Sequence, residues 1–185
     1  MHIRPAQIQD AQAIAALYGH YVRHTVITFA CQEPSAEHYA AQIVQGQYPF
    51  LVAEDEHGLA GFAYADAFRQ KEAFRWDVEL TIYLRPGLER QGLGSRLMQA
   101  LLTLLRRQGY LLAYSCITLP NPASIALHKR FSFEELGVFP RTGYKLGRWC
   151  DVIWLQLTLG DHTQAPAEPI PFASLASDEV AALLS

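Results

Sequence analysis

Two glycines, Gly92 and Gly94, stand at the start of a strongly apolar helical pattern in the segment LERQGLGSRLMQALLTLL. The first backbone N–H groups of a helix have no partner within it, and the helix dipole makes that end positive. Because glycine has no Cβ, a phosphate can approach such a backbone closely. The two glycines also fit a plain strand-to-helix turn. The segment lacks the lysine of a P-loop and the third glycine of a dinucleotide fingerprint.

A second group of reactive side chains lies in the segment WDVELTIYL, residues 76–84. Hydrophobic and polar residues alternate here, so Glu79, Thr81 and Tyr83 share one face of a predicted strand. A carboxylate on such a face can serve as a general base. The pattern alone also fits an ordinary exposed strand glutamate.

The whole chain indicates one globular domain that acts on a small molecule. It has 185 residues, of which 50% are hydrophobic and 18% charged, with a formal net charge of -3. Its basic residues are dispersed, so we expect no nucleic-acid surface. The opening decapeptide has no apolar signal core, and no apolar run approaches the length of a membrane span. We therefore expect no membrane partner.

The cysteines and histidines indicate neither disulfides nor a metal site. Cys31, Cys116 and Cys150 are odd in number and show no CxxC spacing, as expected of thiols in a reducing compartment. The seven histidines are scattered and form no HExxH pair, so no metal is expected.

The elements that must position these residues follow from caps, periodicity and turns. Asp10 is predicted to cap a first helix and Ser35 a second that stops at Gly46. Strands are predicted at 2–6, at two segments within 49–68 joined at His57 and Gly58, and at 76–84, 111–119, 133–139 and 149–159; helices are predicted at 11–22, 36–45, from Gly94 to Gly109, and at 122–131.

The predicted order is β-α-α-β-β-β-α-β-α-β-β, which indicates a mixed sheet with helices packed on it. The helix after Gly94 carries a wide apolar stripe formed by Leu97, Met98, Leu101, Leu102, Leu104 and Leu105. We expect residues 1–160 to form the domain. Residues 161–185 read as a proline-rich C-terminal tail, an appendage with one or two helical turns near its end.

Seven blocks in chain order resemble the GNAT superfamily of acetyl-CoA-dependent N-acetyltransferases, and within it the phosphinothricin acetyltransferase family. The resemblance extends from about Ile3 to Leu159. The blocks are TFACQEP, YPFLVAE, AGFAYADAF, WDVELTIYL, RQGLGSRLMQALL, LPNPASIALHKRFSFEELG and GYKLGRWCDVIWLQ.

This resemblance implies an α/β (α+β) fold with a mixed, mostly antiparallel sheet of about seven strands, helices on both faces and a splay between the fourth and fifth strands. It implies acetyl-CoA as co-substrate and a homodimer, with 143–155 as the candidate interface. A cytoplasmic location is expected from the cysteine pattern.

For the chemistry, the resemblance implies that Glu79 is the general base that frees the lone pair of an attacking amine. The backbone from Thr81 through Ile82 to Tyr83 would hold the pantetheine arm and the acetyl group. Either His128 or Tyr83 would protonate the leaving thiolate, and the choice between them stays open.

The resemblance assigns the coenzyme to the glycine loop and to the helix at 122–131. The implied residues are Thr81, Ile82, Tyr83, Glu89, Arg90, Gln91, Gly92, Leu93, Gly94, Ser95, Asn121, Ser124 and Arg130, with Lys129 as a further cation. Two positions depart from the family pattern. Glu89 stands where Gln or Arg is usual, and we expect it to point to solvent. Ser132 stands where a glycine is usual.

The implied acceptor is the α-amine of a small amino acid, such as phosphinothricin, methionine sulfoximine or methionine sulfone. The resemblance places Phe29, Arg69, Lys71, Phe74, Val78 and Glu79 around it. Another small amine or a protein N-terminus is the alternative acceptor. A coenzyme A-binding module without turnover is the alternative from another class, and the presence of Glu79 argues against it.

Overall fold

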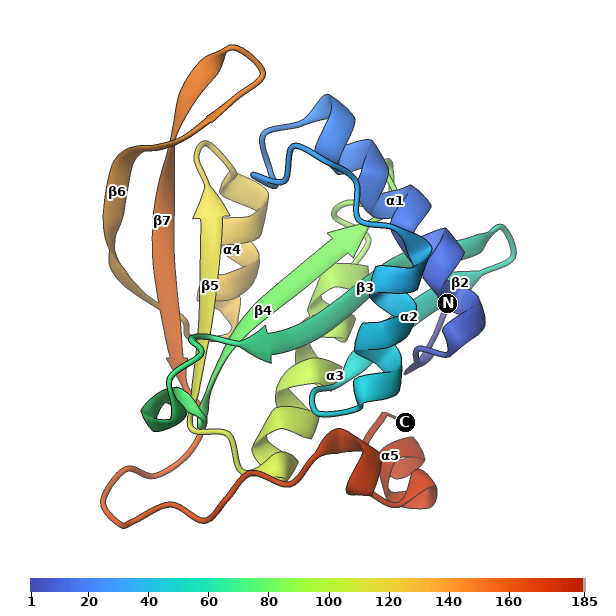
Figure 1. Ribbon diagram of the computed structural model, residues 1–185, viewed down its shortest axis with the longest axis vertical. Helices are drawn as coiled ribbons and strands as arrows, with labels where there is room; N and C mark the ends of the chain where they lie inside the picture. Colours follow the sequence, from blue (N-terminus) through green and yellow to red (C-terminus); the bar gives the residue numbers. More distant parts are fainter. Residues whose placement is uncertain (185) are drawn as a thin grey trace.

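One seven-stranded sheet organises the protein, shown by a computed structural model that describes residues 1–184 (Figure 1). The strands lie in the order β1-β2-β3-β4-β5-β7-β6. Their bounds are β1 His2–Pro5, β2 Phe50–Asp55, β3 Gly58–Ala67, β4 Asp77–Leu84, β5 Leu112–Thr118, β6 Glu134–Lys145 and β7 Arg148–Thr158. Neighbouring strands are antiparallel except β4 and β5, which are parallel. The predicted mixed sheet is confirmed.

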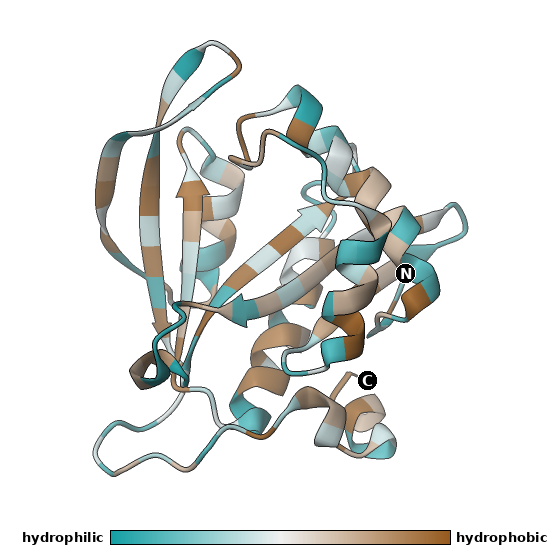
Figure 2. Cartoon of the chain, viewed as in Figure 1, coloured by the Kyte–Doolittle hydropathy of each residue, from teal (hydrophilic) through white to brown (hydrophobic). Residues whose placement is uncertain are grey.

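Helices cover both faces of this sheet, as expected. They are α1 Ala11–His24, α2 Ala36–Gln45, α3 Leu93–Gln108, α4 Pro122–Arg130 and α5 Ser177–Leu184, with short 3₁₀ turns at Ile8–Asp10, Glu72–Phe74 and Phe172–Ser174. α1 and α2 enclose one apolar cluster against the sheet, and α3 encloses a larger one on the other face (Figures 1 and 2). Across residues 1–184, no helix is both long and apolar enough to cross a membrane.

The long helix α3 anchors the larger cluster through the stripe predicted from the sequence. Leu97, Met98, Leu101 and Leu104 are fully buried there. Each such side chain contributes about 1.5–3 kcal/mol on burial. The helix ends at Gly109, whose φ of +89° is the left-handed conformation that glycine adopts without strain. α3 is therefore a fixed support for whatever its first turn holds.

The two predicted caps have different outcomes. The Ser35 hydroxyl accepts a hydrogen bond from the His38 N–H, which confirms the cap of α2. The prediction for Asp10 is wrong. A 3₁₀ turn precedes α1, so Asp10 is already helical, and its carboxylate accepts bonds from the Gln7 N–H and the Arg4 guanidinium. The Arg4 guanidinium lowers the pKa of this carboxyl group.

Several element ends also differ from the prediction. α1 continues to His24, and α3 begins at Leu93, which places Gly94 inside the first helical turn. β6 continues to Lys145, well beyond the predicted end at 139. Two register shifts against β7 let this strand follow its partner to the hairpin turn.

The C-terminal segment is packed against the domain, contrary to the expected appendage. Its Leu175 and Val180 belong to the same apolar cluster as α3. The side-chain amide of Gln108, which is 1% exposed, donates to the carbonyls of Gln47 and Ile170 at 3.0 and 2.8 Å. The predicted turns near the end of the chain form α5. The segment thus covers core surface.

Replacing Gln108 with alanine should lower the free energy of unfolding by about 1–3 kcal/mol, because the buried amide that joins the Gln47 and Ile170 carbonyls is lost. Urea unfolding would show a lower midpoint at constant slope. Gln99→Ala, which removes an exposed amide from the same helix, is the matched control and should change little. Equal stability of the two variants would contradict the anchoring role of Gln108.

Candidate active site

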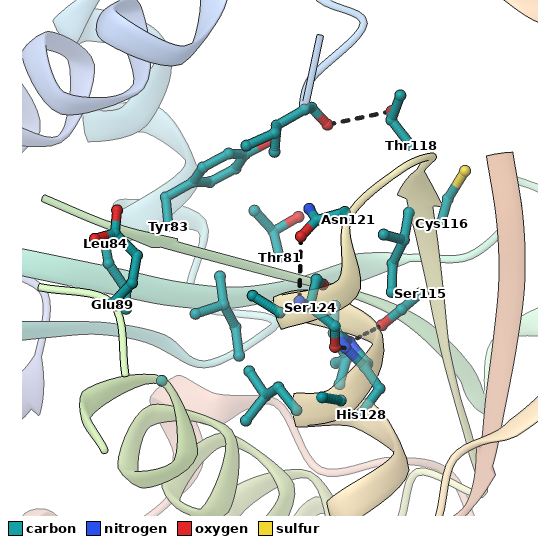
Figure 3. A pocket seen from close by; sticks show the side chains of 18 of the residues that line it. Thr81, Tyr83, Leu84, Glu89, Ser115, Cys116, Thr118, Asn121, Ser124 and His128 are labelled. Atoms are coloured by element: carbon teal, nitrogen blue, oxygen red, sulfur yellow. Dashed lines mark hydrogen bonds between the residues drawn. The ribbon is translucent and has the colours of Figure 1, made fainter. Parts of the chain in front are cut away.

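The site begins where β4 and β5 separate. These parallel strands pair at only three positions, the last joining Glu79 to Tyr114. Beyond this point they fan apart, as Figure 1 shows. A cavity of about 780 Å³ lies in the opening and is also lined by α1, the first turn of α3 and α4 (Figure 3).

The separation leaves one edge of β4 without a strand partner. From Leu80 to Leu84 the strand pairs with β3 alone. Backbone N–H and C=O groups on the other edge therefore face the cavity, except that the Leu84 carbonyl accepts a bond from the Tyr21 hydroxyl at 2.6 Å. An extended ligand can pair with this edge as an added strand would.

The first turn of α3 forms one wall of the cavity. Gly92 caps the helix with a φ of +82°, Arg90 before it has a φ of +62°, and no side chain caps the helix. Gly92, Gly94 and Ser95 line the cavity, so backbone donors at the positive end of the helix face it. Glu89 is exposed, and its carboxylate accepts a bond from the Gly87 N–H.

Asn121 and the start of α4 form the adjoining wall. The Asn121 side-chain oxygen accepts the Ser124 N–H at 3.1 Å and so caps α4. Its amide nitrogen remains as a donor beside the cavity. At the other end of α4, the Arg130 guanidinium donates to the Ser95 hydroxyl and brings a cation beside the first turn of α3.

Glu79 is the carboxylate at the closed end of the opening. Burial raises its pKa, the nearby Arg69 charge opposes that shift, and Asp66 adds to it. Asp66 lies opposite Glu79 in the β3–β4 register. A carboxylate with a raised pKa is a stronger base than a free one, which suits proton removal from an amine.

An aromatic platform holds Arg69 near Glu79. The Arg69 guanidinium lies 4.0 Å over the ring of Phe68 and 5.6 Å from that of Trp154. Phe68 itself stacks on Tyr114 with ring centroids 4.0 Å apart. This cation is therefore held by cation–π contacts on the same side of the sheet as Glu79.

His128 lies under the cavity and joins α4 to β5. Its Nδ1 is 2.8 Å from the Ser124 carbonyl, and its Nε2 is 2.9 Å from the Ser115 hydroxyl (Figure 3). Phe133 packs against the ring with centroids 4.9 Å apart. Burial lowers the pKa of His128, which favours the neutral imidazole.

Tyr83, the alternative proton donor, lies among aromatic rings. Its ring centroid is 5.0 Å from that of Tyr18, 4.8 Å from that of Tyr21 and 5.6 Å from that of Phe62. Burial raises the pKa of Tyr83 well above its usual value, so the phenol stays protonated.

Comparison with known proteins decides the family. Residues 3–154 match the acetyltransferase (GNAT) domain. The chain is 34% identical over 173 residues to a phosphinothricin N-acetyltransferase of Streptomyces viridochromogenes, with 92% of each chain covered. The chain belongs to the GNAT acetyltransferase family.

Two further acetyltransferases are similar to this chain over most of its length. An L-methionine sulfoximine/L-methionine sulfone acetyltransferase of Pseudomonas aeruginosa is 36% identical over 172 residues, covering 89% of this chain and 98% of its own. The structure of a phosphinothricin acetyltransferase from Sinorhizobium meliloti in complex with acetyl-CoA has a TM-score of 0.85 and 35% identity. It covers 91% of this chain and 94% of its own.

In this acetyltransferase, a loop between α1 and α2 roofs the cavity with Ile27, Thr28 and Phe29. The Lys145 ammonium, in the β6–β7 hairpin, donates to the Thr28 carbonyl at 2.7 Å, and burial lowers its pKa. The Thr118 hydroxyl donates to the Ile27 carbonyl at 3.4 Å (Figure 3). The roof is thus held by two bonds to its backbone and by a bond between the Thr28 and Tyr18 hydroxyls at 2.6 Å.

Gly143 explains why the hairpin can approach this roof. A Cβ at Gly143 would overlap the Phe29 ring. The glycine therefore provides the space in which Phe29 lies against the β6 backbone.

The cavity brings together most of the residues predicted from the sequence. Those that line it are Phe29, Glu79, Thr81, Ile82, Tyr83, Glu89, Arg90, Gly92, Gly94, Ser95, Asn121, Ser124, His128 and Arg130. Arg69 lies near Glu79. Phe74, which is 37% exposed, packs against Phe68. Lys71 is exposed and directly precedes the 3₁₀ turn that contains Phe74.

The remaining predicted residues do not present side chains to the cavity. Val78 is fully buried on the core face of β4, opposite to Glu79, so its side chain does not face the cavity. Leu93 is buried in the core, and the Gln91 side chain donates to the Gly87 carbonyl. Lys129 is exposed on α4.

Several lining residues were not predicted, among them Tyr18, Tyr21, Ser115, Cys116 and Thr118. A signal existed for Ser115, because it is a polar residue in the middle of an otherwise apolar strand. Cys116 lies on the same face as Tyr114, and burial together with the Glu79 charge raises the pKa of its thiol to about 11. This thiol therefore stays protonated at neutral pH.

Proposed function

We propose that this protein transfers the acetyl group of acetyl-CoA to the α-amine of a small amino acid. Phosphinothricin, methionine sulfoximine and methionine sulfone are the proposed acceptors, supported by the names of the relatives. The observation that carries the proposal is the pair formed by Glu79 and Arg69 at one side of the opening. Glu79 would accept a proton from the ammonium group of the acceptor. Arg69 beside it would bind the acidic or strongly polar end of the same molecule.

The walls of the cavity fit the co-substrate. The glycine turn before α3 provides backbone donors and the Arg90 cation for its phosphates, and Arg130 at the end of α4 provides a second cation. Gln91 and Leu93 would contribute through backbone N–H groups alone. The open edge of β4 from Thr81 to Tyr83 would pair with the pantetheine amides. Asn121 and Ser124 would bind this arm from the opposite side.

Glu79 would accept the proton of the ammonium group, because burial raises the pKa of its carboxyl group. Backbone N–H groups on the open edge of β4 would receive the charge that develops on the thioester oxygen. The thiolate that leaves then needs a proton. His128 and Tyr83 remain the two candidates for its source.

Arg69, Lys71, Phe29 and Phe74 are proposed to surround the acceptor. Arg69 would bind its acidic or oxidised end, with Lys71 contributing further positive charge. Phe29 in the roof and Phe74 beside Phe68 would form apolar walls. Val78 is not part of this proposal.

We further propose a homodimer that works in the cytoplasm. β6 is the edge strand of the sheet, and the β6–β7 hairpin exposes a set of large apolar side chains: Leu136, Val138, Phe139, Tyr144, Leu146 and Trp149. Such a patch is typical of a protein interface. The three free cysteines suit a reducing compartment.

The identity of the acceptor can be tested by measuring the release of free thiol from acetyl-CoA in the presence of a panel of amino acids, polyamines and peptides. We expect turnover with phosphinothricin, methionine sulfoximine or methionine sulfone. Arg69→Met should raise the acceptor KM by about 10- to 100-fold, the equivalent of a charged hydrogen bond of ~1.5–3 kcal/mol. Turnover of polyamines or peptides alone would contradict the proposal. Coenzyme binding without turnover would indicate a regulatory module.

Glu79→Gln keeps the shape of the side chain and removes the base, so turnover should fall by ~10²–10⁴ at neutral pH. The loss should shrink as pH rises, because more of the substrate amine is already free. Coenzyme binding measured by calorimetry should stay close to that of the wild type. A variant within a few-fold of wild-type turnover at neutral pH would rule Glu79 out as the base.

Gly92→Ala should weaken acetyl-CoA binding, because the side chain disfavours the positive φ that turns the backbone donors toward the cavity. Gly58→Ala is the matched control. Gly58 also has a positive φ and open space around it, and it lies in the β2–β3 hairpin. Calorimetry should show weaker binding for the first variant alone. Equal binding by both would place the phosphates elsewhere.

A further inference from the structure

The surroundings of His128 determine where its proton lies. The Ser124 carbonyl can only accept a hydrogen bond, so the Nδ1 atom 2.8 Å away must carry the hydrogen. In the neutral ring Nε2 is then the acceptor. The Ser115 hydroxyl, 2.9 Å from Nε2, must be its donor.

The ring is also closed off from direct contact with a reactant. His128 is 6% exposed, both of its nitrogens are bonded, and Phe133 packs against it. Ser115 is 2% exposed, and it lines the cavity together with His128. A proton that passes between Nε2 and the cavity therefore meets the Ser115 oxygen.

Strand geometry places this pair opposite the proposed base. Glu79 and Tyr114 are register partners and share a face of the sheet. Ser115 follows Tyr114, so its side chain points to the other face, toward α4. Glu79 and Ser115 thus border the same opening from opposite faces.

We propose that Ser115 is the relay through which His128 takes up and returns a proton during the reaction. The inference rests on the proposed function. It assigns Ser115 as the group that contacts the reacting atoms and makes His128 a positioning and proton-storing residue behind it. His128 then acts as an acceptor first and a donor second, because the resting ring has no proton to give from Nε2.

The proton transfers balance. After Glu79 has deprotonated the ammonium group and the amine has attacked, the new C–N bond leaves a second proton on nitrogen. That N–H bond breaks as the Ser115 oxygen takes the proton, and the original Ser115 proton moves to Nε2. When the C–S bond breaks, the Nε2 proton returns to the Ser115 oxygen and a Ser115 proton passes to sulfur. Serine and histidine are both regenerated, and Glu79 releases the first proton to solvent.

Nitrogen-15 NMR of the imidazole in the coenzyme-free protein provides the first test, independent of catalysis. The neutral His128 ring should carry its hydrogen on Nδ1, with Nε2 accepting a hydrogen bond. Ser115→Ala should change the Nε2 signal, because the hydroxyl bonded to that nitrogen is gone. No acidic side chain bonds the ring among residues 1–184, and the nearest cations along α4, Lys129 and Arg130, are exposed. A wild-type ring protonated on Nε2 would overturn the relay.

Turnover of Ser115→Ala should fall by ~10²-fold, the lower end of the range for general acid–base catalysis. Acetyl-CoA binding should not change. Ser115→Thr, which keeps the hydroxyl, should restore both the NMR signature and the pH profile. Thr103→Ala, which removes a hydroxyl bonded to the Gln99 carbonyl on α3, is the control remote from the cavity.

A double variant separates the relay from a merely structural role. In a relay the two residues act in series, so Ser115→Ala with His128→Gln should be no slower than Ser115→Ala alone. A further large loss in the double variant would overturn the relay. So would wild-type turnover by Ser115→Ala in an active enzyme. A wild-type protein that acetylates none of the amino acids would instead refute the proposed function. The NMR experiment would still test the hydrogen bonds of His128 in that case.

Discussion

The parallel pairing of β4 with β5 stops after three positions, and the site depends on that early stop. A longer ladder would close the opening and pair the β4 backbone from Leu80 to Leu84 with β5. Because α3 connects the two strands and is anchored by its apolar stripe, the gap between them has a fixed wall. The opening therefore provides three things at once: a cavity, a free strand edge and access from both faces of the sheet.

Burial, more than direct charge pairing, adjusts the proton affinities in this cavity. It raises the pKa of Glu79 and lowers that of His128, so both shifts favour the neutral form. The Arg69 charge partly offsets the shift at Glu79. A carboxyl group with a raised pKa and a histidine with a lowered pKa thus line the same cavity from opposite faces of one sheet.

Much of this arrangement follows from local patterns in the sequence. Alternation in β4 gave the shared face of Glu79, Thr81 and Tyr83, and the apolar stripe gave α3. Contacts between distant segments could not be predicted in this way. Asp10 pairs with Arg4 because a 3₁₀ turn brings them together, and a cap pattern does not contain that information.

The same limit explains the site residues that were missed or misplaced. Ser115 and His128 meet only because α4 folds back onto β5. Val78 was assigned to the acceptor pocket by family position, although the alternation of β4 places it opposite Glu79, on the core face. A position carried over from a family says little about where a side chain points unless the strand pattern is applied as well.

The roof over the cavity has a consequence for how this enzyme can change over generations. Lys145 and Thr118 hold the roof by the carbonyl oxygens of Thr28 and Ile27, and every amino acid has a carbonyl oxygen. A substitution at Ile27, which is 40% exposed, can therefore alter the lining of the cavity while both anchors persist, whereas the buried Thr28 side chain also bonds the Tyr18 hydroxyl. The glycine turn and α4, on the opposite wall, are untouched by such changes. Natural variation at the exposed position of this short loop can thus reshape one side of the cavity while the other walls stay the same.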